Sequence, residues 1–447
     1  MTLSQGTSYG AAGPSSAGAE ATEEPQDHAA GAGQAAGTLR ATQASGVVSL
    51  PAYLRSYVAR VRGGDSGLLP VVAGLVIIST IFEVNNGHFL TAQNLVNLLQ
   101  QGSIYMVMAM GIVFVLLLGE IDLSVGYVGL LGGAVAAEML AATHPLPLAV
   151  VIVAALATTA AIGFVQGLLI TGLGLPSFVV TLAGFLTWQG ILLLVLGNGG
   201  TVPINDNLFN DFATGYITNL ALTWVIVGVL VLAYSLFLWR RDNRRRASGL
   251  VAPPAGLTAM KIAAVAAAGA LLALLVNANR GVLAVAPIRG MPWFVLEVLG
   301  ILLVWSLLLN RTKVGRYVYA IGGNTEGARR AGISTRWVRT LAFTLCSLNG
   351  GIAGLLIAGQ FRGVATSVDG GQLVLYSIAA AVIGGTSLFG GRGRVIHGVV
   401  GGLVIAGIVN GMALLELSAY LQFVITGLVL MVAVTVDAVT HRRAATA

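Results

Sequence analysis

The sequence predicts an all-α protein, a polytopic bundle of about twelve transmembrane helices (roughly ten to fourteen) with both termini in the cytoplasm. Three observations predict it. Hydrophobic residues make up 56% of the chain and charged residues only 9%, too little charge to cover a water-exposed globular surface. Apolar stretches close to the length of a membrane span recur from residue 68 to residue 437. Lys and Arg concentrate in short segments between these stretches, which marks those segments as cytoplasmic.

The N-terminal segment, residues 1–66, precedes the first predicted span and is expected in the cytoplasm. Residues 1–46 are rich in Ala, Gly, Ser and Thr without apolar periodicity, so we expect them to be disordered. Residues 48–62 form a short, basic amphipathic stretch that suits the inner membrane surface. The transmembrane domain is assigned to residues 67–440, and residues 441–447 form a cytoplasmic tail.

The individual spans follow from the apolar stretches and the polar segments between them. In chain order they are predicted at Leu68–Phe82, Ser103–Leu118, Tyr127–Ala142, Leu148–Thr171, Phe178–Leu196, Ala221–Trp239, Lys261–Val276, Met291–Leu309, Thr340–Ala358, Leu373–Phe389, Val395–Leu415 and Ala419–Asp437. The basic segments 240–260, 310–339 and 390–394 are expected in the cytoplasm, and segment 197–218, which has no Lys or Arg, is expected outside. Because several stretches are shorter than about twenty residues, some spans could be re-entrant or broken.

A polar motif, GEIDLSVG at residues 119–126, interrupts the apolar pattern after the second span. A carboxylate at bilayer depth costs about 2.5–3.5 kcal/mol, so it needs a partner, a pathway or an interfacial position. One interpretation makes Glu120 and Asp122 a proton relay or ion site. In the other, Gly119 and Gly126 break the helix, and Asp122, assisted by Ser124, caps the helix that restarts. We favour the second because no intramembrane Lys or His lies near the motif.

The spacing of this motif recurs in the C-terminal half of the chain. The two copies are Gly119-x-x-Asp122-Leu123-x-x-Gly126 and Gly384-x-x-Ser387-Leu388-x-x-Gly391. Similar broken segments in two halves of a transporter indicate the translocation path. We therefore predict that Gly384 and Ser387 belong to the gate, together with the first motif. Chance similarity among glycine-rich membrane helices is the alternative.

The segment Asn310–Arg339 combines high basic charge with helix start and stop signals. Its single acid, Glu326, stands against Arg311, Lys313, Arg316, Arg329, Arg330, Arg336 and Arg339. Asn324 is placed to cap a short helix, predicted at Thr325–Ala331, and Gly332 to end it in the left-handed conformation. Ser334 is placed to cap the next helix. A basic loop that only sets topology is the alternative, but topology alone does not require this stop and restart.

The run from Gly315 to Ile333 resembles the cytoplasmic coupling segment of sugar-type ABC importer permeases, and GEIDLSVG resembles the (G/E)IDLSVG signature of their membrane core. Residues 175–190, 343–359, 379–393 and 411–437 also match, in detail nearest to the xylose-type members. The resemblance covers residues 68–440, with an extra apolar region around 220–290 relative to the ribose-type pattern. It implies that the following residues couple the chain to an ATP-hydrolysing subunit: Arg316, Asn324, Glu326, Ala328, Arg329, Arg330 and Gly332.

Catalytic motifs are missing from the sequence. Its two lysines, Lys261 and Lys313, do not follow the Gly-x-x-x-x-Gly-Lys pattern of a phosphate-binding loop. No nucleophile triad or metal-ligand cluster is recognisable, and no interleaving of aromatic and basic residues indicates nucleic-acid binding. We expect no cofactor and no catalytic residue in this chain, with ATP bound by the partner subunit.

The expected function is a permease subunit of an ABC importer that moves a monosaccharide, xylose or another pentose, across the inner membrane. The resemblance implies ATPase subunits, an extracytoplasmic sugar-binding protein and a second permease copy as partners, with membrane lipid around them. Two alternatives stay open. One is an ion- or proton-coupled secondary transporter, and the other is an ABC permease for branched-chain amino acids or another small solute.

Overall fold

The computed structural model describes residues 69–142, 146–197, 200–249, 252–281 and 287–446. The predictions for residues 1–66 lie outside the described residues. The elements follow in the order α3 (Leu69–Asn86), α4 (Ala92–Leu117), α5 (Val125–Ala141), α6 (Leu148–Leu173), α7 (Ser177–Leu196), β1 (Thr201–Pro203), α8 (Asn207–Thr214), β2 (Tyr216–Ile217), α9 (Leu220–Ala247), α10 (Ala255–Asn277), β3 (Met291–Pro292), α11 (Trp293–Arg311), α12 (Lys313–Gly323), α13 (Thr325–Arg330), α14 (Thr335–Gln360), β4 (Gly363–Ala365), α15 (Gly370–Ile383), α16 (Val395–Leu414) and α17 (Ala419–Thr446).

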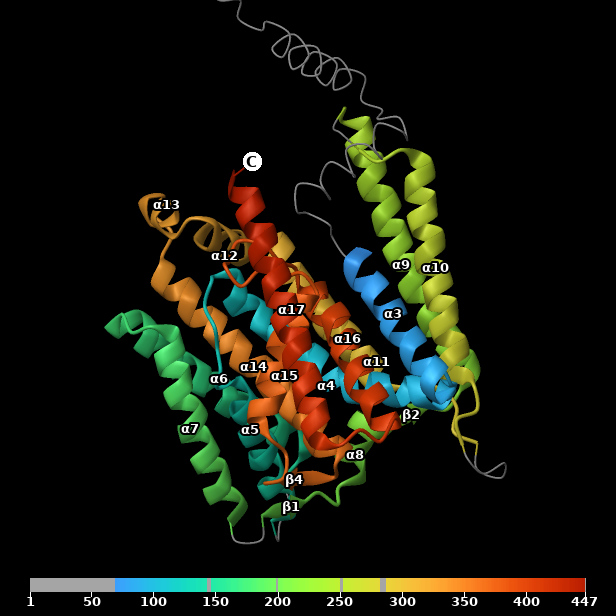
Figure 1. Ribbon diagram of the computed structural model, residues 1–447, viewed down its shortest axis with the longest axis horizontal. Helices are drawn as coiled ribbons and strands as arrows, with labels where there is room; N and C mark the ends of the chain where they lie inside the picture. The colour runs from blue at the N-terminus through green and yellow to red at the C-terminus, as the bar shows by residue number, and fades with distance from the viewer. Residues whose placement is uncertain (1–68, 143–145, 198–199, 250–251, 282–286, 447) are drawn as a thin grey trace, which may run out of the picture.

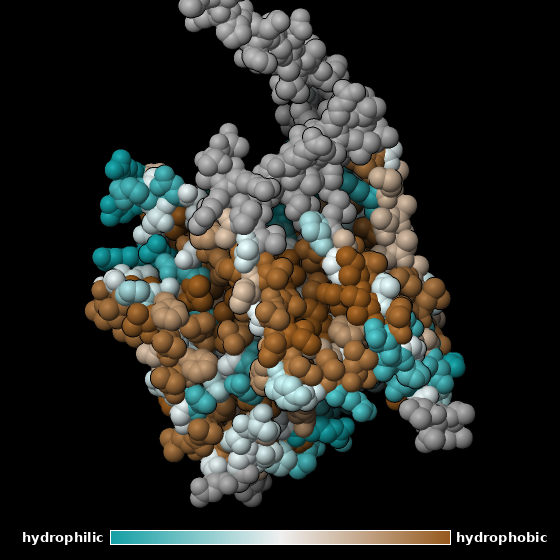
Figure 2. All heavy atoms as spheres, viewed as in Figure 1, coloured by the Kyte–Doolittle hydropathy of each residue, from teal (hydrophilic) through white to brown (hydrophobic). Residues whose placement is uncertain are grey.

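Eight of the described helices are long and apolar enough to cross a membrane: α4, α6, α7, α9, α10, α11, α14 and α16. Shorter apolar helices lie in α3, α5, α15 and α17. Figure 2 shows the matching surface, with a broad hydrophobic band across the middle of the molecule and hydrophilic residues towards its ends. The polytopic helical bundle is thus confirmed, and the number of twelve spans stays a prediction.

Helix α4 lies at the centre of the bundle, because its C-terminal half is buried on every side. Helix α14 packs against it so closely that a Cβ at Gly111 would lie 3.0 Å from the carbonyl oxygen of Cys346. Small residues permit such approaches between membrane helices. The indole N–H of Trp305 on α11 donates to Asn349 Oδ1 on α14 at 2.8 Å, which satisfies both groups inside the bundle.

Helix α4 begins earlier than the predicted span, which started at Ser103. Residues 92–102 were expected to form part of a polar outer connection because they are rich in Asn and Gln. Instead, the amide of Asn94 donates to Asn410 Oδ1 at 2.8 Å, and the carbonyl of Gln100 accepts the Gln360 side chain at 2.9 Å. The Asn94 side chain and the backbone carbonyl of Gln100 thus have partners on other helices, which holds the start of α4 against the bundle.

The basic run 240–246 was predicted as a loop but forms the last two turns of α9. Asp242, whose side chain is fully buried, pairs with Arg241 at 2.9 Å and accepts the hydroxyl of Thr258 on α10 at 3.0 Å. Arg246 also donates to Thr258, at 2.7 Å. These bonds hold the ends of α9 and α10 together and let the helix extend past its apolar part.

Two further differences from the sequence prediction concern the ends of elements. The span predicted at Leu373–Phe389 ends at Ile383, because Gly385, Gly390 and Gly391 adopt positive φ values of 108°, 85° and 72° that no α-helix allows. The fold is also not purely helical, since β1 pairs with β4 and β2 pairs with β3 in two short antiparallel ladders.

The segments with predicted sides lie at two opposite ends of the bundle. Helices α12 and α13, the end of α9 and the start of α10 lie at one end, at the top of Figure 1, where the end of α17 is also seen. Strands β1, β2 and β4 lie at the other end. This arrangement is the one expected if the basic segments are cytoplasmic and segment 197–218 is external.

We predict that a cysteine placed in each of these segments reacts from one side of the membrane only. In a Cys346→Ala background, single cysteines replace the exposed residues Arg245, Arg336 and Asp211. An impermeant maleimide added to intact cells should modify only the cysteine at position 211, and the other two only after the membrane is opened. Labelling of position 336 from outside intact cells would contradict the topology.

Candidate functional site

Helix α12 opens the segment that the sequence analysis expected to couple to an ATPase, although no helix was predicted there. The Thr312 hydroxyl caps it by accepting the N–H of Gly315 at 3.3 Å. Gly315, Val318 and Ile321 recur every three residues and are buried, whereas Arg316 is exposed. This amphipathic spacing lays α12 flat on the end of the bundle.

The short helix that follows, α13, has the predicted cap. Asn324 Oδ1 accepts the N–H of Gly327 at 2.7 Å. The helix ends at Arg330, one residue before the predicted end, and Gly332 adopts φ +80°, as expected for a left-handed stop. Ala328 is buried under the helix. The prediction for Ser334 was wrong: it is the N-cap residue of α14, but its side chain makes no capping hydrogen bond.

The exposed face of α13 carries one acidic and two basic side chains, which form ion pairs with one another. Glu326 pairs with Arg329 at 2.8 Å and with Arg330 at 3.1 Å. Hydrogen bonds from the two guanidinium groups hold the pKa of Glu326 below its usual range. Glu326 therefore stays ionised around neutral pH, and the pairs are lost only when the pH falls through that lowered pKa. Because the arginine side chains are 69% and 79% exposed, they remain available to a partner.

The GEIDLSVG motif forms a break between α4 and α5, as predicted at Gly119, but the prediction that Gly126 also breaks the helix was wrong, because Gly126 lies within α5. Gly119 has φ +73°, and Asp122 is fully buried. Asp122 Oδ1 accepts the N–H of Ser124, the N-cap residue of α5, at 2.9 Å, so it closes the turn just before the helix, and capping of the helix's own N–H groups stays a prediction. Ser124, which was expected to assist Asp122, makes no side-chain capping bond to α5 and instead bonds to Asp122. Its hydroxyl lies 2.7 Å from Asp122 Oδ1 and 3.0 Å from the side-chain amide of Gln166 on α6.

The second copy of the spacing forms a comparable turn between α15 and α16. Ser387 Oγ accepts the N–H of Phe389 at 3.2 Å, just as Asp122 accepts the N–H two residues further on. The two breaks also touch, because Gly391 donates its N–H to the carbonyl of Leu117 at 2.9 Å. The repeat found in the sequence therefore corresponds to two contacting breaks at one place in the bundle.

One glycine of each copy, Gly126 in the first and Gly384 in the second, permits close packing against another segment. A Cβ at Gly126 would overlap the carbonyl of Gly370 at the start of α15. A Cβ at Gly384 would overlap the carbonyl of His397 on α16. Gly384 has φ −64°, so the positive φ values of this break begin only at Gly385.

Glu120 has a partner that the sequence analysis missed. Arg339, in the second turn of α14, places its Nε 3.4 Å from Glu120 Oε1. The two side chains are 31% and 15% exposed, respectively. Arg339 ends the basic segment that was expected in the cytoplasm, so it was not expected to meet a residue of this motif. The fold thus joins one predicted site residue of the break to the end of the predicted coupling segment.

The matching family model describes the permease component of branched-chain amino acid transport systems and covers residues 94–434. The chain belongs to this permease family. It is 36% identical to the xylose transport system permease protein XylH of Escherichia coli over 391 residues, 85% of this chain and 96% of that protein. The XylH protein of Haemophilus influenzae is also 36% identical, over 82% of this chain and 95% of the relative. The ribose import permease protein RbsC of Escherichia coli is 30% identical, over 83% and 93%. No solved structure matches the chain. These relatives confirm the resemblance to sugar-type permeases, with higher identity to the xylose type.

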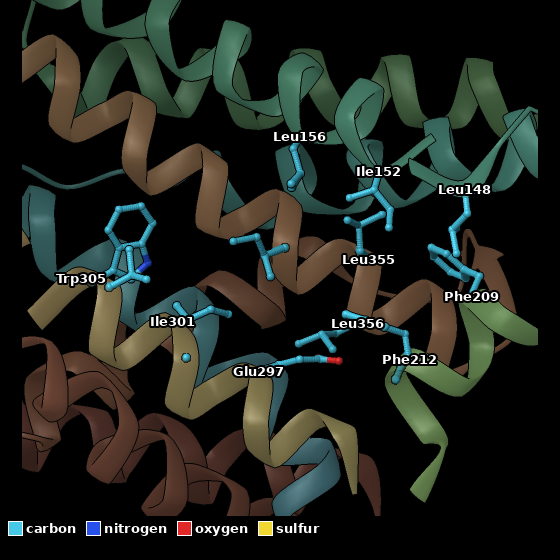
Figure 3. Close-up of a pocket in the computed structure, with 14 residues that line it drawn as sticks. Leu148, Ile152, Leu156, Phe209, Phe212, Glu297, Ile301, Trp305, Leu355 and Leu356 are labelled. Atoms are coloured by element: carbon cyan, nitrogen blue, oxygen red, sulfur yellow. The ribbon is translucent and has the colours of Figure 1, made fainter. Parts of the chain in front are cut away.

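The permease also contains an apolar cavity of about 460 Å³ between α6, α8, α11 and α14. Figure 3 shows Glu297 of α11 pointing into it among aliphatic and aromatic side chains. Its Oε1 atom is buried and has no hydrogen-bond partner among the described residues. The sequence analysis did not name Glu297 as a candidate site residue. The sequence signal that could have indicated it is an acidic residue within a long apolar stretch.

We predict that the permease tolerates Asp122→Asn far better than Asp122→Leu. The amide keeps an oxygen for the Ser124 N–H, whereas leucine leaves that buried donor unpaired at a cost of about 1–3 kcal/mol. Thermal unfolding in detergent and solute uptake at matched expression measure both effects. Equal loss of uptake in the two variants, with the stability of Asp122→Asn preserved, would favour a proton- or ion-carrying carboxylate.

Proposed function

We propose that the chain is the membrane-spanning permease subunit of an ABC importer for a monosaccharide, with xylose or another pentose as its substrate. The observation that carries the proposal is the capped, basic helix α13, presented at one end of the bundle on α12. A helix held out in this way suits docking to another protein. The similarity to XylH and RbsC, which are named for xylose and ribose, supports a pentose.

The family model is named for branched-chain amino acids, so that substrate class is the alternative within the family. Identity over nearly the full length of the xylose and ribose permeases favours a sugar. Gln372 and Tyr376 on α15 are sugar-contact candidates, because their side chains hydrogen-bond to each other at 2.7 Å and both can bind hydroxyl groups.

The proposed assembly contains two permease copies in the inner membrane, two ATPase subunits and an extracytoplasmic sugar-binding protein. ATP binding closes the ATPase subunits, α13 carries that motion to the membrane, and the path opens alternately to each side. The soluble protein selects the sugar, so the permease needs only weak sugar contacts. ATP is bound and hydrolysed by the partner subunits, and this chain contributes no cofactor site.

The rival function is a secondary transporter driven by ions or protons. One observation favours it, because Asp122 Oδ2 is buried and has no hydrogen-bond partner among the described residues. Two others disfavour it. Glu120 is paired with Arg339, and Asp122 Oδ1 is engaged by Ser124.

Uptake measurements test the substrate and the energy source together. Cells that express the permease with its partners should accumulate labelled xylose. Unlabelled pentose should compete, and leucine should not. A proton uncoupler should have no effect while cellular ATP is maintained. Competition by leucine would indicate the amino acid alternative, and loss of uptake under the uncoupler at constant ATP would indicate the secondary transporter.

Docking through α13 is tested by reversing its exposed charges. Arg329→Glu combined with Arg330→Glu should leave the permease in the membrane but abolish copurification of the ATPase and reduce uptake at least tenfold, because the contact surface changes sign. The double replacement by Gln checks the charge without placing three acids on one short helix. The matched control is Arg244→Glu with Arg245→Glu, an equal reversal on exposed residues of α9 at the same end of the bundle. Full copurification and uptake in the α13 variants would contradict the docking role.

A further inference from the structure

The first turns of α14 connect the coupling segment to the membrane core. Helix α14 begins at Thr335, shortly after α13 ends. It is anchored on α6 by the hydroxyls of Thr340 and Thr171, which lie 3.0 Å apart. Gly167 leaves room for this contact, since a Cβ there would lie 2.7 Å from the Cα of Thr340. The start of α14 is therefore fixed to α6 directly after the coupling segment ends.

One face of α14 meets the break between α4 and α5. Arg339 pairs with Glu120, and Cys346, seven residues later and so on the same face, lies beside Asp122. The Arg339–Glu120 separation of 3.4 Å is longer than those of the exposed pairs on α13, at 2.8 and 3.1 Å. The Arg339–Glu120 contact is therefore an ion pair without a hydrogen bond at Arg339 Nε among the described residues, and it links the start of α14 directly to the break.

Helix α12 reaches the same break by backbone contact. A Cβ on Gly322 would overlap the carbonyl of Leu117, the last residue of α4. That carbonyl accepts the N–H of Gly391 in the second break. The Tyr319 hydroxyl donates to the carbonyl of Gly393 at 2.8 Å. The coupling segment therefore touches both breaks, through α12 on one side and through Arg339 on the other.

We propose that Glu120 and Arg339 are positioning residues that transmit the movement of the α12–α13 segment to the break between α4 and α5. The proposal rests on the function proposed above. A shift of α13 moves α12 against Leu117 and the start of α14 against Glu120, so the break is displaced as a unit. Asp122 then serves the internal structure of the break, and Glu120 serves its link to the coupling segment.

The pair is tested in the assembled transporter, reconstituted with its ATPase and sugar-binding partners. Glu120→Gln and Arg339→Gln should copurify a normal amount of ATPase and still hydrolyse ATP. Uptake of the labelled pentose should fall at least about fivefold, the lower end of typical coupling between sites, so fewer sugars move per ATP. The reversed pair, Glu120→Arg with Arg339→Glu, should recover most of the loss. Glu138→Gln on α5 is the control, because it removes an exposed acid and should change nothing.

The backbone contact has its own matched pair of variants in the last turn of α12. Gly322→Ala should lower the uptake per ATP, because its Cβ would overlap the Leu117 carbonyl. Gly323→Ala should not, since a Cβ there has nothing within 4 Å. Together these variants distinguish a local mechanical contact from a general loss of helix stability.

Two outcomes would overturn the proposal. One is wild-type uptake per ATP in both single Gln variants. The other is a reversed pair that transports no better than the single variants, because the pair's charge attraction would then have no role. Absence of ATPase copurification and of ATP-driven uptake with the unaltered permease would instead remove the proposed function itself. The two failures are therefore distinguishable.

Discussion

The break between α4 and α5 depends on one constraint: a buried backbone in the bilayer must find its hydrogen-bond partners inside the protein. The carbonyl of Leu117, freed where α4 ends, accepts the N–H of Gly391 from the other break. The Ser124 N–H at the start of α5 is satisfied by Asp122. Each break therefore needs hydrogen-bond partners from other parts of the chain. The bond from Gly391 to Leu117 shows that the two breaks provide one such partner to each other. The segment from α12 to the start of α14 contacts both breaks at this shared place.

The two carboxylates of the motif differ in what surrounds them, although they are two residues apart. Asp122 is fully buried and its bonds are local, to Ser124. Glu120 is partly exposed and pairs with an arginine far away in the sequence. A locally bonded carboxylate stabilises a turn, whereas a long-range pair reports the relative position of two helices. The same short motif thus combines a residue bonded within the break with one that links the break to α14.

The sequence predicted what local patterns determine. Apolar stretches located most of the helices, and the Asn324 cap and the Gly332 stop defined α13 to within one residue. Errors arose where tertiary contacts override composition. Asn94 and Gln100 made the start of α4 look like a loop, and the basic end of α9 is helical because Asp242 bonds to α10. The Glu120–Arg339 pair could not be predicted from spacing, because it depends on how α14 crosses the break.

The geometry of the coupling segment also explains why its arginines cannot all serve one purpose. Arg329 and Arg330 are exposed and share Glu326, so a partner can compete for them at little cost, because surface ion pairs stabilise only weakly. Arg339 lies further along the chain, where α14 enters the bundle, and its partner Glu120 has a side chain that is 15% exposed. Breaking this pair costs more than breaking an exposed one, because partly buried charges are screened less by the solvent. Along this segment the ion pairs therefore change from exposed ones on α13, which exchange at little cost, to a more shielded one that ties the start of α14 to the break between α4 and α5.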